Sequence, residues 1–481
     1  MRAAALIRLL IVFLGFFSLT MTAPLIMALA LEEKTMIRAF AVPLAASCLA
    51  ALPVFLTWRK NRPRINTREG IFLVAAAWLC GSVLGAVPFR LSGFVPRFVD
   101  AVFESVSGFT TTGASIIPDV EILPKSFHLW RGMSHWLGGM GIVVLTVAIV
   151  PALGVGGFNL LKAETSGPLK EKITPRTAET AKILWLIYCG LTIIMILLLC
   201  AGGMNVFEAV IHGFSAMGSG GFSTRNGSIA AFNSPYIEWV CTIFMLVAGF
   251  NFTLVYRIIQ RRFREAAANS EAKAYGLVIL SAGCLAACAL LPHAGSVGRA
   301  LRLAFFDVAS IISTTGFVID NHNLWPPLAR LAVFLLLFCG GCSGSTAGGI
   351  KIIRHTILIK QMQSELRRIL WPSALSSIRL DNRPGRKDVV YSVAGFIALY
   401  FFMLFAGIAV TAASGMDLYT AINASAICIG NIGLGFGELI SGNVIAASPG
   451  FVKITLSFLM IAGRLELYTV LILFTPAFWK R

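Results

Sequence analysis

Four stretches of this 481-residue chain repeat one pattern, and the repeat limits the possible folds more than any other feature. Each stretch has the pattern of a short amphipathic helix that runs into a glycine followed by an apolar residue. An alanine stands twelve residues before each glycine. The stretches, with their alanines and glycines, are Phe98 to Ala114 (Ala101, Gly113), Val206 to Phe222 (Ala209, Gly221), Arg302 to Phe317 (Ala304, Gly316) and Leu418 to Leu434 (Ala421, Gly433).

Long apolar runs separate these stretches. Hydrophobic residues make up 57% of the chain and charged residues 13%, which excludes an ordinary soluble globular protein. Runs of about 20 apolar residues cross the hydrocarbon core of a bilayer, so we predict a polytopic membrane protein with about ten transmembrane helices. The predicted spans are Leu6–Leu31, Ile37–Thr57, Gly70–Val87, Ser134–Val155, Ile183–Ala201, Trp239–Tyr256, Tyr275–Leu291, Ala329–Ile353, Val389–Ala413 and Val452–Phe474.

The first apolar run has two interpretations. Arg2 and Arg8 precede it, as basic residues precede the apolar part of a signal peptide. The run from Leu9 to Leu31 is too long for a usual signal peptide, however, and its removal would upset the alternation of charge in later loops. We therefore interpret it as a retained transmembrane helix.

The net charge of +18 raises the question of a nucleic-acid partner, and the placement of the charge argues against one. Basic residues gather in alternate loops, which the positive-inside rule assigns to the cytoplasm. Both chain termini are then cytoplasmic, and the lipid bilayer is the expected surrounding. The basic segments are Trp58 to Arg68, Arg257 to Lys273, Lys351 to Lys387 and Lys480-Arg481.

The short helices predict a pore. At about 12 residues they are too short to cross a membrane and suit re-entrant segments. Non-helical backbone at membrane depth is tolerated only where protein buries it or water lines it, so four related glycine turns predict one axial cavity. We predict an all-α fold of four pseudo-fourfold helix–pore-helix–filter–helix units, with four re-entrant pore helices, and an N-terminal two-helix hairpin. The predicted boundaries are 1–62 (hairpin), 63–158, 159–265, 266–370 (with an intramembrane gating loop) and 371–481.

The chemistry of the turns favours a cation. Rings of backbone carbonyls replace the water that a cation loses in a narrow pore, and glycine reaches the required backbone angles without a Cβ penalty. The negative C-terminal ends of four half-helices would add to this preference. The alternative is that these are packing glycines, which are common in transmembrane helices. The candidate cation-binding residues are Thr111, Thr112, Gly113, Ser219, Gly220, Gly221, Thr314, Thr315, Gly316, Asn431, Ile432 and Gly433.

A second glycine-rich segment predicts a gate. Gly340 to Gly349 contains five glycines, each of which costs a helix about 1 kcal/mol relative to alanine. The helix should therefore break there into a flexible plug below the filter, with close helix packing as the alternative. Arg464 lies near the middle of the last span, where a charge usually lines a wet path or forms a structural ion pair. Glu466, two residues on, is a poor partner for it. The candidate gate residues are Gly340, Gly341, Gly344, Ser345, Thr346, Gly348, Gly349, Lys351 and Arg464.

These motifs resemble the Trk/Ktr/HKT superfamily of potassium transporters, and most closely its bacterial TrkH-type members. One departure is Leu434, which stands where many relatives carry proline. The segments that carry the resemblance are Ser107–Ala114, Ser219–Thr224, Thr314–Phe317, Asn431–Leu434, Trp130-Arg131, His135–Gly141, Gly340–Lys351 and Gly463–Glu466.

The resemblance implies K⁺ uptake across the bacterial inner membrane, with K⁺ as the transported ion and no organic cofactor. It also implies a homodimer in which each subunit has its own pore, controlled by a cytoplasmic nucleotide-binding TrkA-type subunit. Whether ATP or NAD(H) regulates it, and whether H⁺ or Na⁺ moves with K⁺ as in a symporter, stay open. The alternative function is a Na⁺-permeable or cation-coupled secondary transporter. A membrane enzyme is not favoured, because the six histidines show no metal-binding spacing.

Overall fold

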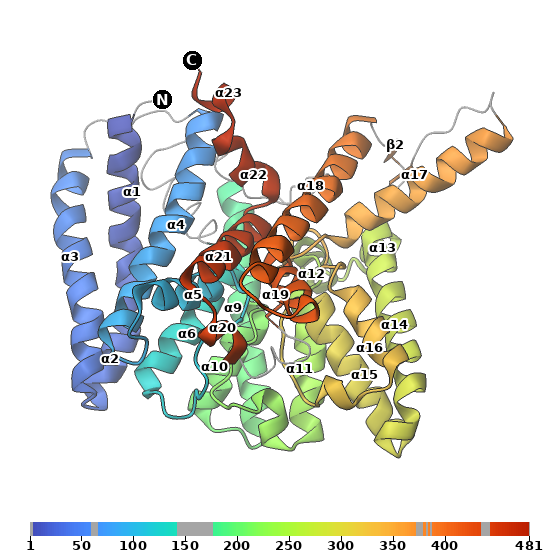
Figure 1. Cartoon of the computed structure of the whole chain (residues 1–481), viewed down its shortest axis with the longest axis horizontal. Coiled ribbons are helices and arrows are strands. Elements are labelled where there is room, and N and C mark those ends of the chain that lie inside the picture. Colours follow the sequence, from blue (N-terminus) through green and yellow to red (C-terminus); the bar gives the residue numbers. More distant parts are fainter. Residues whose placement is uncertain are drawn as a thin grey trace.

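The computed structural model describes residues 3–58, 66–141, 177–371, 379–380, 383–384, 387–433 and 443–480. In this part of the chain, helices are joined by loops, and the one ladder is formed by two-residue strands (Figure 1). These strands, β1 (Arg379–Leu380) and β2 (Arg383–Pro384), pair antiparallel. The prediction of an all-α fold is confirmed.

Several helices have the length and composition of membrane spans. Within the described residues, six are long and apolar enough to cross a bilayer, and two bent helix pairs would each add one crossing. These eight match eight of the ten predicted spans. The predicted span Ser134–Val155 leaves the described residues after Gly141. The predicted span Ala329–Ile353 is interrupted by the glycine-rich loop.

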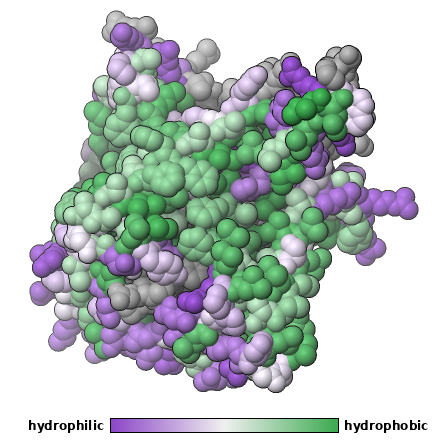
Figure 2. All heavy atoms as spheres, turned by 45° about the vertical axis from the view of Figure 1, so that its right-hand side comes forward, coloured by the Kyte–Doolittle hydropathy of each residue, from purple (hydrophilic) through white to green (hydrophobic). Residues whose placement is uncertain are grey.

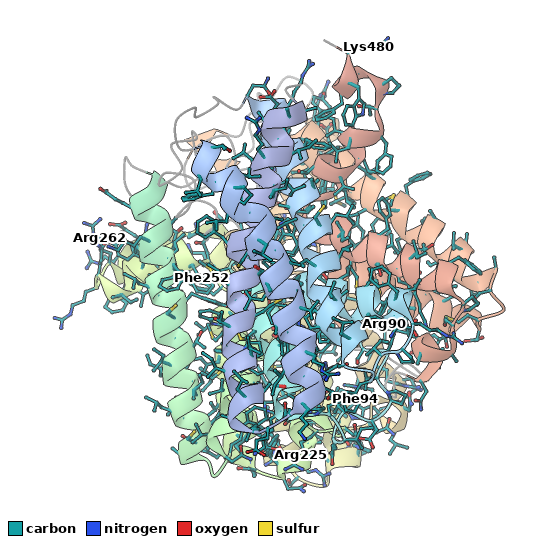
Figure 3. All side chains as sticks on the ribbon, turned by 90° about the vertical axis from the view of Figure 1, so that its left-hand side faces the viewer. Arg90, Phe94, Arg225, Phe252, Arg262 and Lys480 are labelled. Atoms are coloured by element: carbon teal, nitrogen blue, oxygen red, sulfur yellow. The ribbon has the colours of Figure 1, made fainter. Side chains whose placement is uncertain are left out.

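The surface agrees with a membrane location. Figure 2 shows a face whose middle is covered by hydrophobic residues, with hydrophilic residues gathered along its lower edge. In Figure 3, Lys480 lies at one end of the molecule and Arg225 at the other, with Phe252 between them. Both ends of the chain lie at the same edge of the bundle (Figure 1). The chain is a multi-pass membrane protein.

An N-terminal hairpin packs beside the first predicted unit. Its long helices contact each other, and α1 also contacts α4. The ring of Phe17 lies 5.1 Å from that of Phe109 and 6.4 Å from that of Trp130, which fixes the hairpin to the first pore helix. The hairpin consists of α1 (Ala3–Ser18), η1 (Leu19–Met21), α2 (Thr22–Ala30) and α3 (Lys34–Trp58).

The four predicted units follow one plan, in which a long helix precedes and packs against a short pore helix. Unit one contains α4 (Thr67–Leu91), α5 (Phe98–Phe109) and α6 (Lys125–Gly139). Unit two contains α9 (Thr177–Ala201), α10 (Val206–Met217), η2 (Ser228–Phe232), α11 (Pro235–Ala248), α12 (Phe252–Ile259) and α13 (Phe263–Ala268). Unit three contains α14 (Ser270–Ala294), α15 (Val297–Ile312), η3 (His322–Leu324), α16 (Pro327–Leu336) and α17 (Ile352–Leu370). Unit four contains α18 (Lys387–Ala412), α19 (Leu418–Gly430), α20 (Asn443–Ala447), α21 (Gly450–Arg464), α22 (Leu467–Leu471), η5 (Ile472–Phe474) and α23 (Pro476–Trp479).

Capping residues set where the pore helices begin. The side chains of Asn205, Ser296 and Asp417 each accept a hydrogen bond from a backbone amide in the first turn of α10, α15 and α19. The third pore helix therefore begins at Val297, directly after its cap, and not at Arg302 as the repeat predicted. The cap moves the boundary because it satisfies an amide that the helix itself leaves unpaired.

The units close into a ring through their helices. The helix that follows one glycine turn packs against the pore helix of the next unit in three cases, α6 on α10, α11 on α15, and α21 on α5. The third and fourth units meet through α17 and α18. Because α21 belongs to unit four and α5 to unit one, the last unit packs against the first. The boundaries between units stay predictions.

Candidate functional site: four glycine turns and an intramembrane loop

Each pore helix ends in the same strained turn. We call the segments Thr110–Gly113, Gly218–Gly221, Ser313–Gly316 and Gly430–Gly433 the glycine turns. In each, the glycine has a φ of 70° to 81°, and the residue two before it has a φ of 53° to 57°. The residue between them is not in the left-handed region. The residues two before the glycines are Thr111, Ser219, Thr314 and Asn431.

This conformation is unfavourable for three of the four residues. A left-handed conformation costs a residue with a Cβ about 1–2 kcal/mol, although asparagine tolerates it better than most. The same pair of backbone hydrogen bonds holds every turn. In unit one, the Thr111 amide donates to the Gly108 carbonyl and the Thr112 amide donates to the Ser107 carbonyl. Equivalent bonds recur in units two, three and four. The strain is therefore built into each unit.

The turns interlock through their glycines. A Cβ placed on Gly113 would lie 1.7 Å from the carbonyl oxygen of Gly220, in the turn of unit two. One placed on Gly221 would lie 2.1 Å from the Thr315 oxygen, in unit three. One placed on Gly433, in unit four, would lie 2.0 Å from the oxygen of Thr112, in the turn of unit one. Each of these glycines therefore faces the carbonyl that precedes the glycine of the following unit.

The interlocked turns form a neutral, oxygen-rich centre. The residues before the glycines are fully buried, and hydroxyl pairs support them in two units. The Thr110 and Thr112 hydroxyl oxygens lie 2.8 Å apart, and those of Ser313 and Thr315 lie 2.7 Å apart. Carbonyl and hydroxyl oxygens without a full negative charge suit a weakly held, mobile cation. The structure thus brings together all four segments of the predicted filter, up to Gly433. Leu434 lies outside the described residues.

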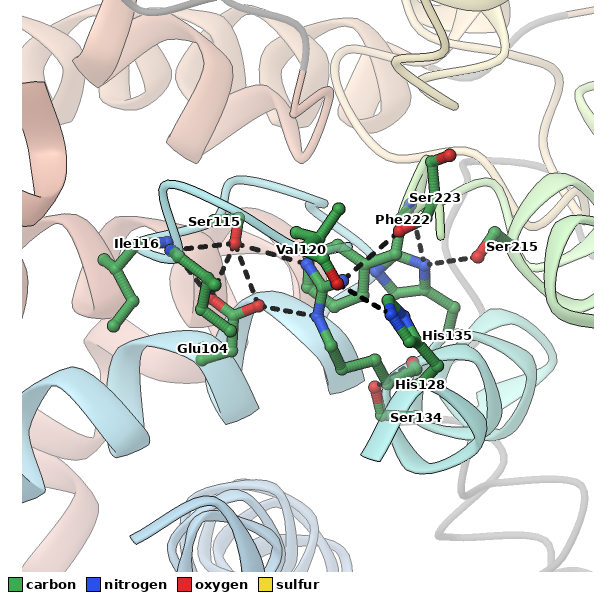
Figure 4. Close-up of polar contacts among 12 residues, drawn as sticks. Glu104, Ser115, Ile116, Val120, His128, Ser134, His135, Ser215, Phe222 and Ser223 are labelled. Carbon is green, nitrogen blue, oxygen red and sulfur yellow. Dashed lines mark hydrogen bonds and ion pairs between the residues drawn. The ribbon is translucent and has the colours of Figure 1, made fainter. Parts of the chain in front are cut away.

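A polar residue nine positions before the glycine braces the turn in three units. The carboxylate of Glu104 accepts hydrogen bonds from Ser115 Oγ at 3.0 Å and from the Ile116 amide at 3.1 Å (Figure 4). In units two and three, His212 Nε2 lies 2.9 Å from Ser223 Oγ, and Asp307 lies 2.8 Å from His322 Nε2. Each brace ties the pore helix to the segment beyond the turn.

Sequence reasoning missed these braces, although a signal was present. Glu104, His212 and Asp307 share one register in the repeat, three residues after the repeated alanine, and unit four has Ala424 there. A charged residue inside an apolar half-helix usually has a partner, because an unpaired buried charge is costly. The identity of that partner depends on chain segments that only the fold brings close.

Helix α6 of unit one supports the turn of unit two. Arg131 pairs with Glu104 at 2.9 Å, and its guanidinium lies 4.0 Å from the centre of the Phe222 ring. The His135 ring stacks on the same Phe222 ring, with centroids 4.0 Å apart, and its Nδ1 accepts a hydrogen bond from the Phe222 amide at 3.4 Å (Figure 4). Phe222 directly follows a turn glycine, so these contacts fix the spacing between neighbouring turns.

The loops that follow the first two glycine turns are also joined to each other. The Asn226 side chain of unit two donates from Nδ2 to the Asp119 carboxylate at 2.8 Å, and its Oδ1 accepts a hydrogen bond from the Val120 amide at 2.9 Å. The hydrogen bond from Asn226 lowers the pKa of the exposed Asp119 carboxyl below its usual value. The carboxylate therefore stays ionised at neutral pH.

The predicted gating segment is non-helical, as its composition indicates, but it follows a defined path. The Cys342 amide donates to the Gly249 carbonyl at 2.8 Å, and Thr346 donates to the Ala248 carbonyl. Glu271 of α14 accepts from the amides of Ser343 and Ile353, at 2.6 and 3.2 Å. The expectation of a plug without stable structure is corrected to that extent, because neighbouring helix ends satisfy the loop's backbone.

Two helix breaks lie beside this loop. The pair α11 and α12 bends by 105°, and the pair α21 and α22 bends by 117°. The first bend includes Gly249, whose carbonyl binds the loop, and the second lies between Arg464 and Leu467. Breaks free backbone carbonyls that a continuous helix would use internally, and such backbone is tolerated at membrane depth only in protein or water.

Arg464 joins the loop to unit one. Its guanidinium donates to the Thr346 carbonyl at 2.7 Å and to the carbonyls of Gly138 and Gly139 at 2.6 and 3.0 Å. Glu466 pairs instead with Arg354, in line with the prediction that it is a poor partner for Arg464. Lys351 donates to the Ala347 carbonyl within the loop. The structure therefore brings Arg464 and the predicted gate segment into direct contact.

The sequence of this chain matches the TrkH model, described as a cation transport protein, over residues 36–275 and 293–481. The chain belongs to this family. It is 38% identical to the Trk system potassium uptake protein TrkH of Halomonas elongata, over 99% of each chain. It is 37% identical to the protein of that name from Escherichia coli, over 96% of each. The crystal structure of the potassium transporter TrkH from Vibrio parahaemolyticus superposes with a TM-score of 0.87 at 32% identity, over the whole of both chains.

The comparisons confirm the family that the motifs indicated, and with it the fold class. The family consists of transport proteins, and this chain is a transporter and not an enzyme. The assignment of individual residues to a filter or a gate rests on the geometry described above and stays a prediction.

We expect Glu104→Gln to destabilise the protein, because it leaves the Arg131 guanidinium buried without a counter-charge. Breaking a buried pair in this way costs about 3–5 kcal/mol. Thermal unfolding of the purified protein in detergent measures the loss. Glu121→Gln is the matched control, since Glu121 lies 4.0 Å from Arg225 in an exposed pair that contributes at most about 1 kcal/mol. Equal melting temperatures for the two variants would contradict the role of Glu104.

Proposed function

We propose that this chain carries K⁺ into the cell through a pore whose selectivity filter consists of the four glycine turns. The observation that carries the proposal is the interlocking of the turns, in which the glycines of one unit face the carbonyl oxygens of the next. Relatives that share the full length of the chain are named as potassium uptake proteins, which supports K⁺ as the ion. The neutral oxygens at the turns supply ligands that replace water around the ion.

No coupled chemistry is needed for inward movement. With the cell interior negative, each 100 mV contributes about 2.3 kcal/mol per charge. The alternative is a Na⁺-permeable or cation-coupled secondary transporter. Transporters of that kind usually contain inverted halves, whereas the four units here repeat in one orientation. Uptake of K⁺ and Na⁺ compared in cells that lack other potassium uptake would separate the two functions.

We expect Gly113→Ser to lower the K⁺ over Na⁺ permeability ratio by about tenfold, equivalent to about 1.4 kcal/mol of discrimination. The reason is that a Cβ at this position collides with the Gly220 carbonyl and displaces one member of the ring. Permeability ratios are measured by ion replacement across proteoliposomes or patches. The control is Gly298→Ser in α15, where a Cβ meets open space. An unchanged ratio in Gly113→Ser at normal expression would remove Gly113 from the filter.

We further propose that the segment Gly340 to Gly349 and Arg464 form the gate below the filter. The loop contacts the turns directly, since the Gly348 amide donates to the Thr314 hydroxyl at 2.7 Å. Arg464 holds the loop through the Thr346 carbonyl and places a fixed positive charge next to it. Arginine suits both tasks, because it is always charged and has five donors. A positive charge in a cation path also raises the barrier to passage.

Shortening the loop by deleting Gly344 to Gly348 should raise K⁺ flux in the absence of any partner protein, because it removes the obstruction. Arg464→Ala should also raise flux, since it removes the barrier and the anchor of the loop together. The measurement is the rate of K⁺ uptake into proteoliposomes that contain the purified chain alone. If both variants fold and conduct no faster than the parent, these residues are structural and the gate lies elsewhere.

A cytoplasmic TrkA-type nucleotide-binding subunit is the proposed regulator, and the proposed assembly is a homodimer in the bacterial inner membrane with both termini in the cytoplasm. Exposed arginines at the end of α12 and along α17 supply a basic face. Helix α17 extends away from the rest of the chain (Figure 1) and exposes Ile359, Met362, Leu366 and Ile369. This unpartnered apolar surface supports contact with a second copy.

Replacing Arg261, Arg262, Arg367 and Arg368 together by Glu should abolish copurification with the cytoplasmic subunit, because it reverses the charge of the basic face. The assay is affinity capture from cells that express both proteins. Arg97→Glu is the control, since this exposed arginine precedes α5 on the side assigned to the exterior. Undiminished capture of the fourfold variant would place the docking surface elsewhere.

A further inference from the structure

The residues two before the turn glycines all carry a side-chain oxygen, but their surroundings differ. Thr314 Oγ1 accepts a hydrogen bond from the Gly348 amide of the loop at 2.7 Å. Thr111 Oγ1, at the same register in unit one, is buried and makes no hydrogen bond within the described part of the chain. Asn431 donates from Nδ2 to Thr112 Oγ1 at 3.0 Å, and its Oδ1 is likewise buried without a bond among the described residues.

Gly348 fits closely between the turns of units three and four. Besides donating to Thr314, it lies so near unit four that an added Cβ would be 2.7 Å from the Gly430 carbonyl oxygen. The same Cβ would be 2.8 Å from the Asn431 Cβ and 3.1 Å from its Oδ1. A residue with any side chain could not occupy this position without a shift. The loop therefore meets the turns at one backbone amide, and the contact is specific for glycine.

The Thr314 hydroxyl is a ligand that two partners would compete for. A hydroxyl has one donor and two acceptor lone pairs, and the lone pairs are what a cation would use. An N–H group presents the positive end of its dipole to the oxygen, as a cation does. Arg464 binds the carbonyl of Thr346, two residues before Gly348, and adds positive charge nearby. In the docked state, the Gly348 amide therefore occupies the Thr314 oxygen in place of the cation.

We propose that the Thr314 hydroxyl is a latch shared by the loop and the transported cation. In the docked state it holds the Gly348 amide, and when the loop leaves it is released to a cation at the inner end of the turns, beside Thr111 and Asn431. Gate opening then completes an ion site, and ion binding at that site disfavours return of the loop. This inference rests on the proposed function, in which the turns select the ion and the loop closes the pathway.

Substitution of Thr314 and of its counterpart Thr111 by valine tests the latch. Valine keeps the β-branched shape, so the backbone strain at either position is nearly unchanged. Thr314→Val should raise partner-free K⁺ flux at saturating K⁺ by about threefold to tenfold, the range that one net hydrogen bond supports, and should also raise the half-saturating K⁺ concentration. Thr111→Val should raise the half-saturating concentration and should not raise partner-free flux. Thr314→Ser keeps the hydroxyl and should restore closure.

A double-mutant cycle adds an independent check. Gly348→Ala displaces the same contact from the loop side, so it should raise partner-free flux as Thr314→Val does. Both changes break the hydrogen bond between Gly348 and Thr314, and Gly348→Ala also disturbs the contact with unit four. Adding Thr314→Val to Gly348→Ala should therefore raise flux no further. Independent, multiplicative effects would overturn the latch.

The loop deletion separates failure of the latch from failure of the gate. If deletion of Gly344 to Gly348 raises flux but Thr314→Val behaves like Thr111→Val, the loop closes the pathway without the latch and the inference is wrong. If the deletion also leaves flux unchanged, the proposed gate itself is wrong. Thermal unfolding of each purified variant confirms that a loss of flux is not a loss of fold.

Discussion

The glycine turns approach one another so closely that a single methyl group at Gly113, Gly221 or Gly433 would overlap a carbonyl oxygen of the neighbouring unit. This absence of side chains at the contacts between units is the constraint on which the rest of the structure depends. Because each glycine belongs to one unit and the carbonyl to the next, no unit can form its part of the centre alone. The same close approach places several neutral oxygens around one axis, which is the arrangement that a dehydrating cation requires.

Such turns need support from outside, since threonine and serine hold a left-handed conformation in them. The support comes from a shell of buried polar contacts around the ring. Glu104, with Arg131, links a pore helix to the segment beyond its turn, and Arg131 and His135 then pack on Phe222 of the next unit. Neighbouring turns are thereby fixed relative to each other. If the turns bind the ion as proposed, stability and ion recognition depend on the same contacts, so a change in the shell should alter both.

The glycine-rich loop, Gly340 to Gly349, also contacts the turns, through the bond from the Gly348 amide to the Thr314 hydroxyl. The break after α11 frees the Gly249 carbonyl, which binds a loop amide. Arg464 donates to backbone carbonyls of the loop, at Thr346, and of the end of α6, at Gly138 and Gly139. These bonds are individually modest and leave the guanidinium able to exchange them for water.

The sequence alone determined the membrane class, the four pore-helix repeats and the glycines at their ends, because apolar length and left-handed backbone both leave local signatures. It also located Gly340 to Gly349 and Arg464, since glycines in a helix and a charge in a span break local rules. The start of α15, the brace from Asp307 to His322 and the bond from Gly348 to Thr314 were decided by the tertiary structure. The start of α15 depends on which capping side chain a loop places at the helix end. The other two join residues 15 and 34 positions apart, and no local pattern specifies which partner the fold brings within reach of a buried polar group.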